Sequence, residues 1–222
     1  MIFRDRTQAG RMLADALRAY AGRQDGIVLG APRGGVPVAF EIAKELHLPL
    51  DVFVLRKLGV PWQEELAFGA IAEGGVRILD QEIIGTLGLS PAQIEKVEQQ
   101  ERQELDRRVR SYRGERPALN VRGRTVILVD DGIATGSTAR AAIAALREMQ
   151  PARMVLAVPV APPSTCQRLR RLLDELVVLD MPDPFYAIGQ FYLDFSPVSD
   201  QVVTGLLARA GASASATVME KG

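Results

Sequence analysis

The most constraining feature of the chain is the segment VILVDDGIATGST at residues 126–138. Its four leading apolar residues are typical of a short buried strand, and two carboxylates, Asp130 and Asp131, follow directly. A loop of small and hydroxylated residues comes next, and an alanine-rich helical pattern begins at Ala139. This order of strand, acidic pair, small-residue loop and helix is the layout expected for holding a sugar phosphate.

Each part of the segment suits one end of such a ligand. The first turn of a helix leaves N–H groups unpaired and carries the positive end of the dipole, so it binds a phosphate. The residues expected to do so are Ala134, Thr135, Gly136, Ser137 and Thr138. Carboxylates repel phosphate but accept hydrogen bonds from vicinal sugar hydroxyls. The plainer alternative is an Asx turn with a helix N-cap, which needs one short polar residue rather than two acids and a hydroxyl-rich loop.

These residues resemble the phosphoribosyl-diphosphate (PRPP) motif of the type I phosphoribosyltransferases, and the resemblance spans roughly residues 1–205. In that family the two acids hold the ribose 2′- and 3′-hydroxyls, and the loop after them holds the 5′-phosphate. The resemblance therefore implies that Asp130 and Asp131 bind the ribose of PRPP. It also implies a transferase that moves a 5-phosphoribosyl group to a nitrogenous acceptor and releases diphosphate.

The chain as a whole predicts an α/β fold with a parallel, doubly wound sheet, because strand patterns alternate with helical ones. The strand patterns lie at residues 27–29, 50–55, 126–129, 154–160 and 176–179. Ligands of such sheets bind at the carboxyl ends of the strands. We expect one domain over residues 1–210 and a disordered tail over 211–222. The family resemblance adds a mobile flap at about 57–75 and a hood at about 180–196, and a helical insert lies at about 80–122.

Two further loops supply cations. The first strand pattern leads into the glycine-rich loop GAPRGG at residues 30–35, whose backbone allows the close approach that a diphosphate needs. By resemblance, Arg33 and Gly34 hold the leaving diphosphate, and a cis peptide is expected at Arg33-Gly34. Lys57 is a second candidate for the diphosphate, with Arg56 as its alternative. A solvated basic pair on a surface turn is the competing interpretation.

Aromatic residues make up only 5% of the chain, yet five of them crowd residues 185–195. Flat rings stack on flat bases, and the string resembles the hood of hypoxanthine-type enzymes. By that match Phe185 stacks on the base, and Asp194 lies near the metal and the diphosphate. The alternative is an aromatic mini-core at the sheet edge. The strand pattern at 154–160 is not followed by the lysine that purine-salvage enzymes carry, so the acceptor stays open.

Composition narrows the possible partners. Lysine plus arginine and aspartate plus glutamate both total 27, so no bulk basic field points to nucleic acid. The apolar runs are far shorter than the ~20 residues that span a bilayer. The polar N-terminus lacks a signal-peptide core, which favours the cytoplasm. The single cysteine, Cys166, excludes an internal disulfide and is expected to be buried and idle.

The sequence thus predicts a Mg²⁺-dependent phosphoribosyltransferase that uses PRPP and a small nitrogenous acceptor, with a homodimer as a possible assembly. Mg²⁺ is expected to bind mainly through PRPP, with Asp194 as the one protein ligand considered. One alternative is a PRPP-sensing regulator that binds nucleic acid through the arginines between residues 101 and 122. The interleaved acids there favour a solvated helix instead. Another sugar-phosphate enzyme of the α/β class is the third hypothesis.

Overall fold

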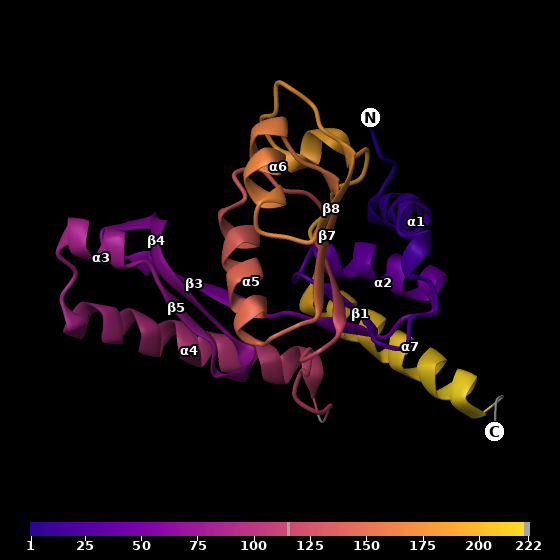
Figure 1. The fold of residues 1–222 in the computed structure, drawn as a ribbon, viewed down its shortest axis with the longest axis horizontal. Helices are drawn as coiled ribbons and strands as arrows, with labels where there is room; N and C mark the ends of the chain where they lie inside the picture. Colours follow the sequence, from indigo (N-terminus) through magenta and orange to yellow (C-terminus); the bar gives the residue numbers. More distant parts are fainter. Residues whose placement is uncertain (115, 220–222) are drawn as a thin grey trace.

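A computed structural model describes residues 1–114 and 116–219, and Figure 1 shows its arrangement. Its centre is a five-stranded sheet in the order β2-β1-β6-β7-β8, in which every neighbouring pair is parallel. The strands are β1 (Gly26–Gly30), β2 (Leu50–Val52), β6 (Thr125–Val129), β7 (Arg153–Val160) and β8 (Glu175–Asp180). Both β1 and β6 are buried along their whole length, as strands covered on both faces must be.

Helices cover both faces of this sheet, so the doubly wound α/β architecture predicted from the sequence is confirmed. One side carries α1 (Arg6–Ala16), α2 (Gly35–Leu46) and α7 (Asp200–Met219), and the other carries α5 (Ser137–Glu148) and α6 (Pro163–Arg170). Short 3₁₀ turns η1 (Arg18–Tyr20), η2 (Glu73–Gly75) and η3 (Ile188–Phe191) complete the described chain. One hydrophobic cluster lies under α1 and α2, another under α5 and α6, and a third under residues 185–195.

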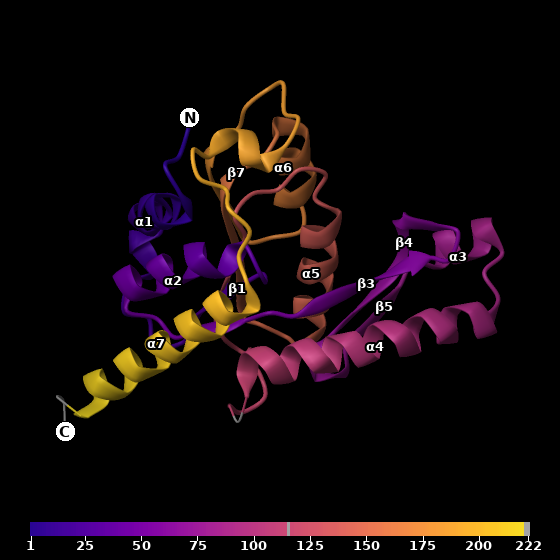
Figure 2. The same ribbon diagram turned by 180° about the vertical axis from the view of Figure 1, so that it is seen from behind.

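A separate unit, which we call the arm, projects from the sheet (Figure 2). It consists of an antiparallel sheet, β3 (Leu55–Val60), β4 (Gln63–Ala72) and β5 (Arg77–Leu79), with α3 (Gln81–Leu87) and α4 (Pro91–Arg113). Helix α4 has a well-defined start, because Ser90 and Gln93 form a reciprocal capping box and Pro91 takes the first helical position.

Residues 57–75, for which the family resemblance implies a mobile flap, form most of the β3–β4 hairpin of the arm. Their mobility stays a prediction. The apolar pattern at 50–55 also contains a break, since β2 ends at Val52 and β3 begins at Leu55. A short apolar run gives no periodicity that would locate such a break. Lys57 therefore lies on the arm and not at the end of a central strand.

The C-terminal stretch also differs from expectation. Helix α7 continues to Met219, over most of the segment predicted as a disordered tail, and residues 220–222 lie outside the described part. Cys166 is buried and free, as predicted. Within the described residues, no helix combines the length and hydrophobicity of a transmembrane span.

Candidate active site

The acidic pair and the first glycine-rich loop meet at one point, because β1 and β6 are neighbours and both end there. This is where the strand order reverses, since β2 lies beyond β1 and β7 beyond β6. A Cβ atom at Gly34 would lie 2.0 Å from Oδ2 of Asp131, and one at Gly35 would lie 2.5 Å from the Val129 carbonyl oxygen. The two loops can approach this closely only because both positions are glycine.

The two carboxylates differ in their surroundings. Asp131 is 8% exposed, and its Oδ2 accepts a 2.8 Å hydrogen bond from Nε of Arg6. Asp130 keeps part of its surface accessible, and its Oδ1 accepts a 2.9 Å hydrogen bond from the backbone N–H of Asp131. One carboxylate is therefore held by an arginine, whereas the other has a single neutral donor within the described residues.

Burial raises the pKa of both groups. The pKa of Asp130 is well above its ordinary value because of desolvation and the adjacent negative charge of Asp131. The pKa of Asp131 is also raised by desolvation, against the opposing effect of the Arg6 guanidinium. Two adjacent carboxylates that are largely removed from water are unfavourable in their charged form. A hydroxyl donor or a cation supplied by a ligand would stabilise that form.

Arg6 and Tyr192 are two site residues that sequence reasoning missed. Besides Asp131, Arg6 contacts the Ser196 carbonyl oxygen at 2.9 Å, and its guanidinium lies 4.0 Å from the centre of the Phe195 ring. The hydroxyl of Tyr192 donates a 2.7 Å hydrogen bond to the backbone carbonyl of Asp131. No local pattern signals these contacts, because 125 residues separate Arg6 from its partner.

The loop between β6 and α5 has the form expected of an anion-binding helix start. Gly136 adopts a left-handed conformation (φ 78°) as the N-cap of α5, and no side chain caps the helix. The Ser137 N–H has only a 3.5 Å contact with Oγ1 of Thr135. Thr135, Ser137 and Thr138 are exposed, so the donors of this first turn remain accessible.

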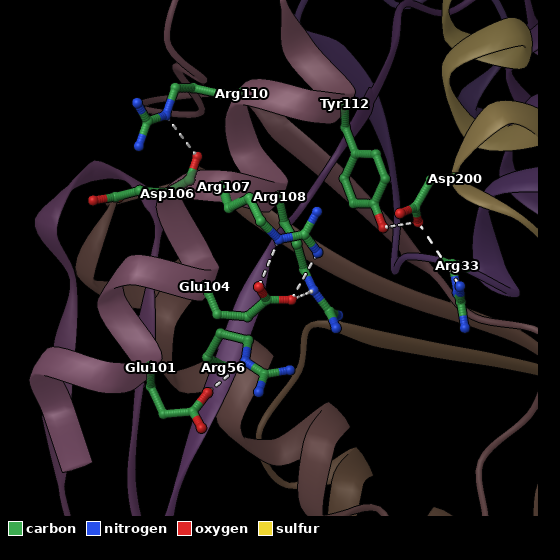
Figure 3. A network of polar contacts seen from close by, with 10 residues as sticks. All are labelled: Arg33, Arg56, Glu101, Glu104, Asp106, Arg107, Arg108, Arg110, Tyr112 and Asp200. Carbon is green, nitrogen blue, oxygen red and sulfur yellow. Dashed lines mark hydrogen bonds and ion pairs between the residues drawn. The ribbon is translucent and has the colours of Figure 1, made fainter.

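Arg33 lies in the loop that follows β1, near the start of α7. Its guanidinium is 3.9 Å from Oδ1 of Asp200 at the start of α7, and the same oxygen accepts a 2.7 Å hydrogen bond from the Tyr112 hydroxyl (Figure 3). The pKa of Tyr112 is raised to about 12, mainly by burial and to a smaller extent by the hydrogen bond to Asp200. The expected cis peptide lies one bond earlier than predicted, at Pro32-Arg33.

The other proposed diphosphate residue, Lys57, is not brought into contact with Arg33. It pairs with Ala70 in the arm and forms no ion pair within residues 1–114 and 116–219. Its neighbour Arg56 donates a 2.6 Å hydrogen bond to Glu101 of α4 (Figure 3). Successive side chains of a strand point to opposite faces, so Lys57 lies on the face away from this pair. Its role stays a prediction.

The segment predicted as a hood contains an aromatic cluster. The ring of Phe185 lies 5.1 Å from that of Phe191, and Tyr192 lies 5.1 Å from Phe195. These rings pack near the sheet edge, as the alternative interpretation held, although Phe185 is only partly buried. Tyr186, which no sequence pattern distinguishes from its aromatic neighbours, is 81% exposed.

Asp194, the residue considered as a metal ligand, already forms hydrogen bonds with a residue close to it in the sequence. Its Oδ1 accepts hydrogen bonds from the backbone N–H and the hydroxyl of Ser196, and these bonds lower its pKa. No group of three or more potential ligands gathers anywhere in the described residues.

Comparison with known proteins agrees with this geometry. The phosphoribosyl transferase domain matches residues 4–196, and the chain belongs to that family. A Mycobacterium tuberculosis protein, Rv0571c, named only provisionally as a phosphoribosyl transferase, is 47% identical over 209 residues. That match covers 94% of this chain and 47% of the relative, so the chain spans about half the length of that protein.

A solved structure gives a closer match in length. The crystal structure of TT1426 from Thermus thermophilus superposes with a TM-score of 0.84 at 42% identity. The match covers 94% of this chain and 99% of the Thermus chain. The protruding arm and the central sheet therefore belong to an architecture that an experimental structure shares over nearly its whole length.

Proposed function

We propose that the chain transfers a 5-phosphoribosyl group from PRPP to a nitrogenous acceptor and releases diphosphate. The observation that carries this proposal is the meeting of three features at one edge of the sheet. These are the acidic pair after β6, the uncapped start of α5, and the loop of Arg33 after β1. Family membership supports the reaction class, while the acceptor and the use of PRPP belong to the proposal.

In this proposal each feature takes one part of PRPP. Asp130 and Asp131 accept hydrogen bonds from the ribose hydroxyls, and the N–H groups from Ala134 to Thr138 bind the 5′-phosphate. Arg33 and the backbone at Gly34 bind the diphosphate, with Lys57 approaching from the arm. Because Asp200 lies 3.9 Å from Arg33, an arriving diphosphate competes with that carboxylate for the guanidinium. Positioning and charge stabilisation supply the rate, without a covalent intermediate on the protein.

Mg²⁺ fits this arrangement as an ion carried by PRPP. When bound, it would offset the negative charge that develops on the leaving diphosphate. Asp130 is the protein group best placed to face the ion or a water attached to it, because it is partly accessible and Arg6 holds only its neighbour. Asp194 is a weaker candidate, since Ser196 already occupies its carboxylate.

The acceptor would bind between the sheet edge and residues 180–196. Phe185 remains the proposed stacking partner, and the exposed ring of Tyr186 adds a second flat surface next to it. A cytoplasmic location and a homodimer stay predictions.

The regulator hypothesis receives no comparable support from the arm. Its arginines were the sequence basis for a nucleic-acid surface, but Arg107 and Arg108 both pair with Glu104 at 2.7 Å. Arg102 pairs with Glu98 at 3.0 Å. Arginines whose charge is neutralised by neighbouring acids contribute little to binding phosphate backbones.

The proposal is tested by calorimetric titration of PRPP with Mg²⁺ against the double variant Asp130→Asn/Asp131→Asn. Charge-assisted hydrogen bonds contribute about 1.5–3 kcal/mol each, so we expect the affinity to fall by about a hundredfold or more. A matched control is Glu104→Gln, which removes one carboxylate from the arm and should leave PRPP affinity unchanged. Equal affinity in the wild type and the double variant would refute the ribose assignment.

The diphosphate assignment is tested separately with Arg33→Ala. This variant should weaken binding of diphosphate with Mg²⁺ by more than it weakens binding of ribose 5-phosphate, because only the former contacts the guanidinium. Equal losses for both ligands would remove the proposed role of Arg33. Diphosphate release in a screen of bases and amines then identifies the acceptor.

A further inference from the structure

A cleft of about 350 Å³ lies between the start of α5 and helix α6, on the opposite face of the sheet from α2 and α7. Three arginines line it, together with hydroxyls at one end and two leucines. The arginines are Arg140, Arg168 and Arg171. Nothing in the proposed reaction uses these three side chains.

The charge of this cleft is uncompensated. No carboxylate lines it, and none of its three arginines forms an ion pair within the described part of the chain. By contrast, Arg102, Arg107 and Arg108 of α4 are neutralised by neighbouring glutamates. Like charges gathered around one cavity repel, so an anion entering the cleft would be stabilised by all three.

The donors at the inner end of the cleft are oriented by hydrogen bonds. Arg168 donates to Oγ1 of Thr165 at 2.9 Å and to the Thr135 carbonyl at 3.4 Å. Thr165 is itself buried, and its hydroxyl donates a 2.8 Å bond to the Ala134 carbonyl. Ser137, at the uncapped start of α5, lines the same end. A guanidinium fixed beside a helix start is suited to a phosphate oxygen.

The size and lining of the cleft define the class of ligand. Three guanidinium groups match a ligand with at least two negative charges, since each can bind a phosphate with two parallel hydrogen bonds. Leu169 and Leu172 form an apolar part of the wall, where the carbon skeleton of a small molecule can pack. A single monovalent anion would leave most of these donors unused.

We infer that the cleft between α5 and α6 is a second anion-binding site, for a small molecule that carries a diphosphate or two phosphates. It goes beyond the proposed transferase function, although its inner end shares Thr135, Gly136 and Ser137 with the loop proposed for the 5′-phosphate. Binding there would therefore be felt at the PRPP loop through the backbone that both sites use.

Inorganic diphosphate, titrated by calorimetry without divalent cations, is the probe. The background is Arg33→Ala, so that the other proposed diphosphate contact is absent. This variant should still bind diphosphate at one site. Adding Arg140→Ala, Arg168→Ala and Arg171→Ala should weaken that binding by at least about tenfold, given the strength of charged hydrogen bonds.

The matched control removes the same charge elsewhere. Arg102→Ala, Arg107→Ala and Arg108→Ala on α4, in the same Arg33→Ala background, should leave the affinity for diphosphate unchanged. An equal loss in this control would show general charge attraction and overturn the inference, as would undiminished affinity in the cleft variant. All three arginines are exposed, and the Arg171 side chain forms no hydrogen bond within the described residues, so Arg171→Ala alone decides if the combined cleft variant does not fold. Unchanged binding in this single variant would overturn the site.

The two proposals fail in distinguishable ways. Failure of the transferase proposal appears as unchanged PRPP affinity in Asp130→Asn/Asp131→Asn. Failure of the second anion site appears as unchanged diphosphate affinity in the cleft variants, whatever the acidic pair does.

Discussion

Glu104 on the arm and Asp130 at the sheet edge are both carboxylates near arginines, yet their pKa values move in opposite directions. Hydrogen bonds from Arg107 and Arg108 lower the pKa of Glu104 to about 2. Desolvation and the charge of Asp131 raise the pKa of Asp130 well above its ordinary value. Folding thus favours the charged form on the arm and disfavours it at the candidate site. Donors supplied by a ligand would therefore favour the charged form of Asp130, whereas Glu104 already receives such donors from its arginines.

The junction between the two regions should show the largest effect on stability. Arg113, at the end of α4, contacts Glu73 at 2.5 Å and Asp51 at 3.3 Å, and the side chains of Arg113 and Glu73 are each only 5% exposed. Arg113→Met would leave a buried acid without its cation, which costs about 3–5 kcal/mol. Urea denaturation measures this cost. A loss below about 1 kcal/mol is typical of an exposed ion pair, and it would show that water reaches the pair of Arg113 and Glu73.

At the sheet edge we expect a substitution to increase stability. A protonated Asp130 contributes stability that is fully present below the ordinary carboxyl pKa and is lost as pH rises through its raised folded value. Asp130→Asn should therefore stabilise the folded protein at neutral pH by about 1 kcal/mol and remove this part of the pH dependence. Thermal melts from pH 4 to 8 test it. A destabilised variant would mean that the carboxylate has favourable partners.

The smallest effect is expected on the arm. Glu104 contributes stability that is present above its unfolded pKa and is lost as pH falls toward about 2, its lowered folded value. The side chain is 30% exposed, so solvent screens the pair and Glu104→Gln should cost only about 0.2–1 kcal/mol. Denaturation at pH 7 and pH 2 compares the two states. The difference between Glu104→Gln and the wild type should be smaller at the lower pH, where the Glu104 carboxylate of the folded protein is partly protonated.

Local signals in the sequence predicted much of this molecule. The apolar run before Asp130 and the small-residue loop after it each act over a few residues, and the structure places strand, loop and helix as expected. The sequence did not predict the β3–β4 hairpin or the ion pair between Arg6 and Asp131. Both depend on contacts between segments, and no local sequence pattern indicates which segments come together. The aromatic segment was ambiguous for a similar reason, because stacking and core packing use the same side chains.

The two glycines that follow Arg33 have a practical consequence. A single methyl group at Gly34 would overlap the Asp131 carboxylate, so Gly34→Ala alters the candidate site without changing the charge of the protein. Such a variant would serve as a site-impaired control of unchanged net charge in growth assays and pull-downs, where a change of charge can itself alter binding. It would separate effects that require the candidate site from effects that require only the folded protein.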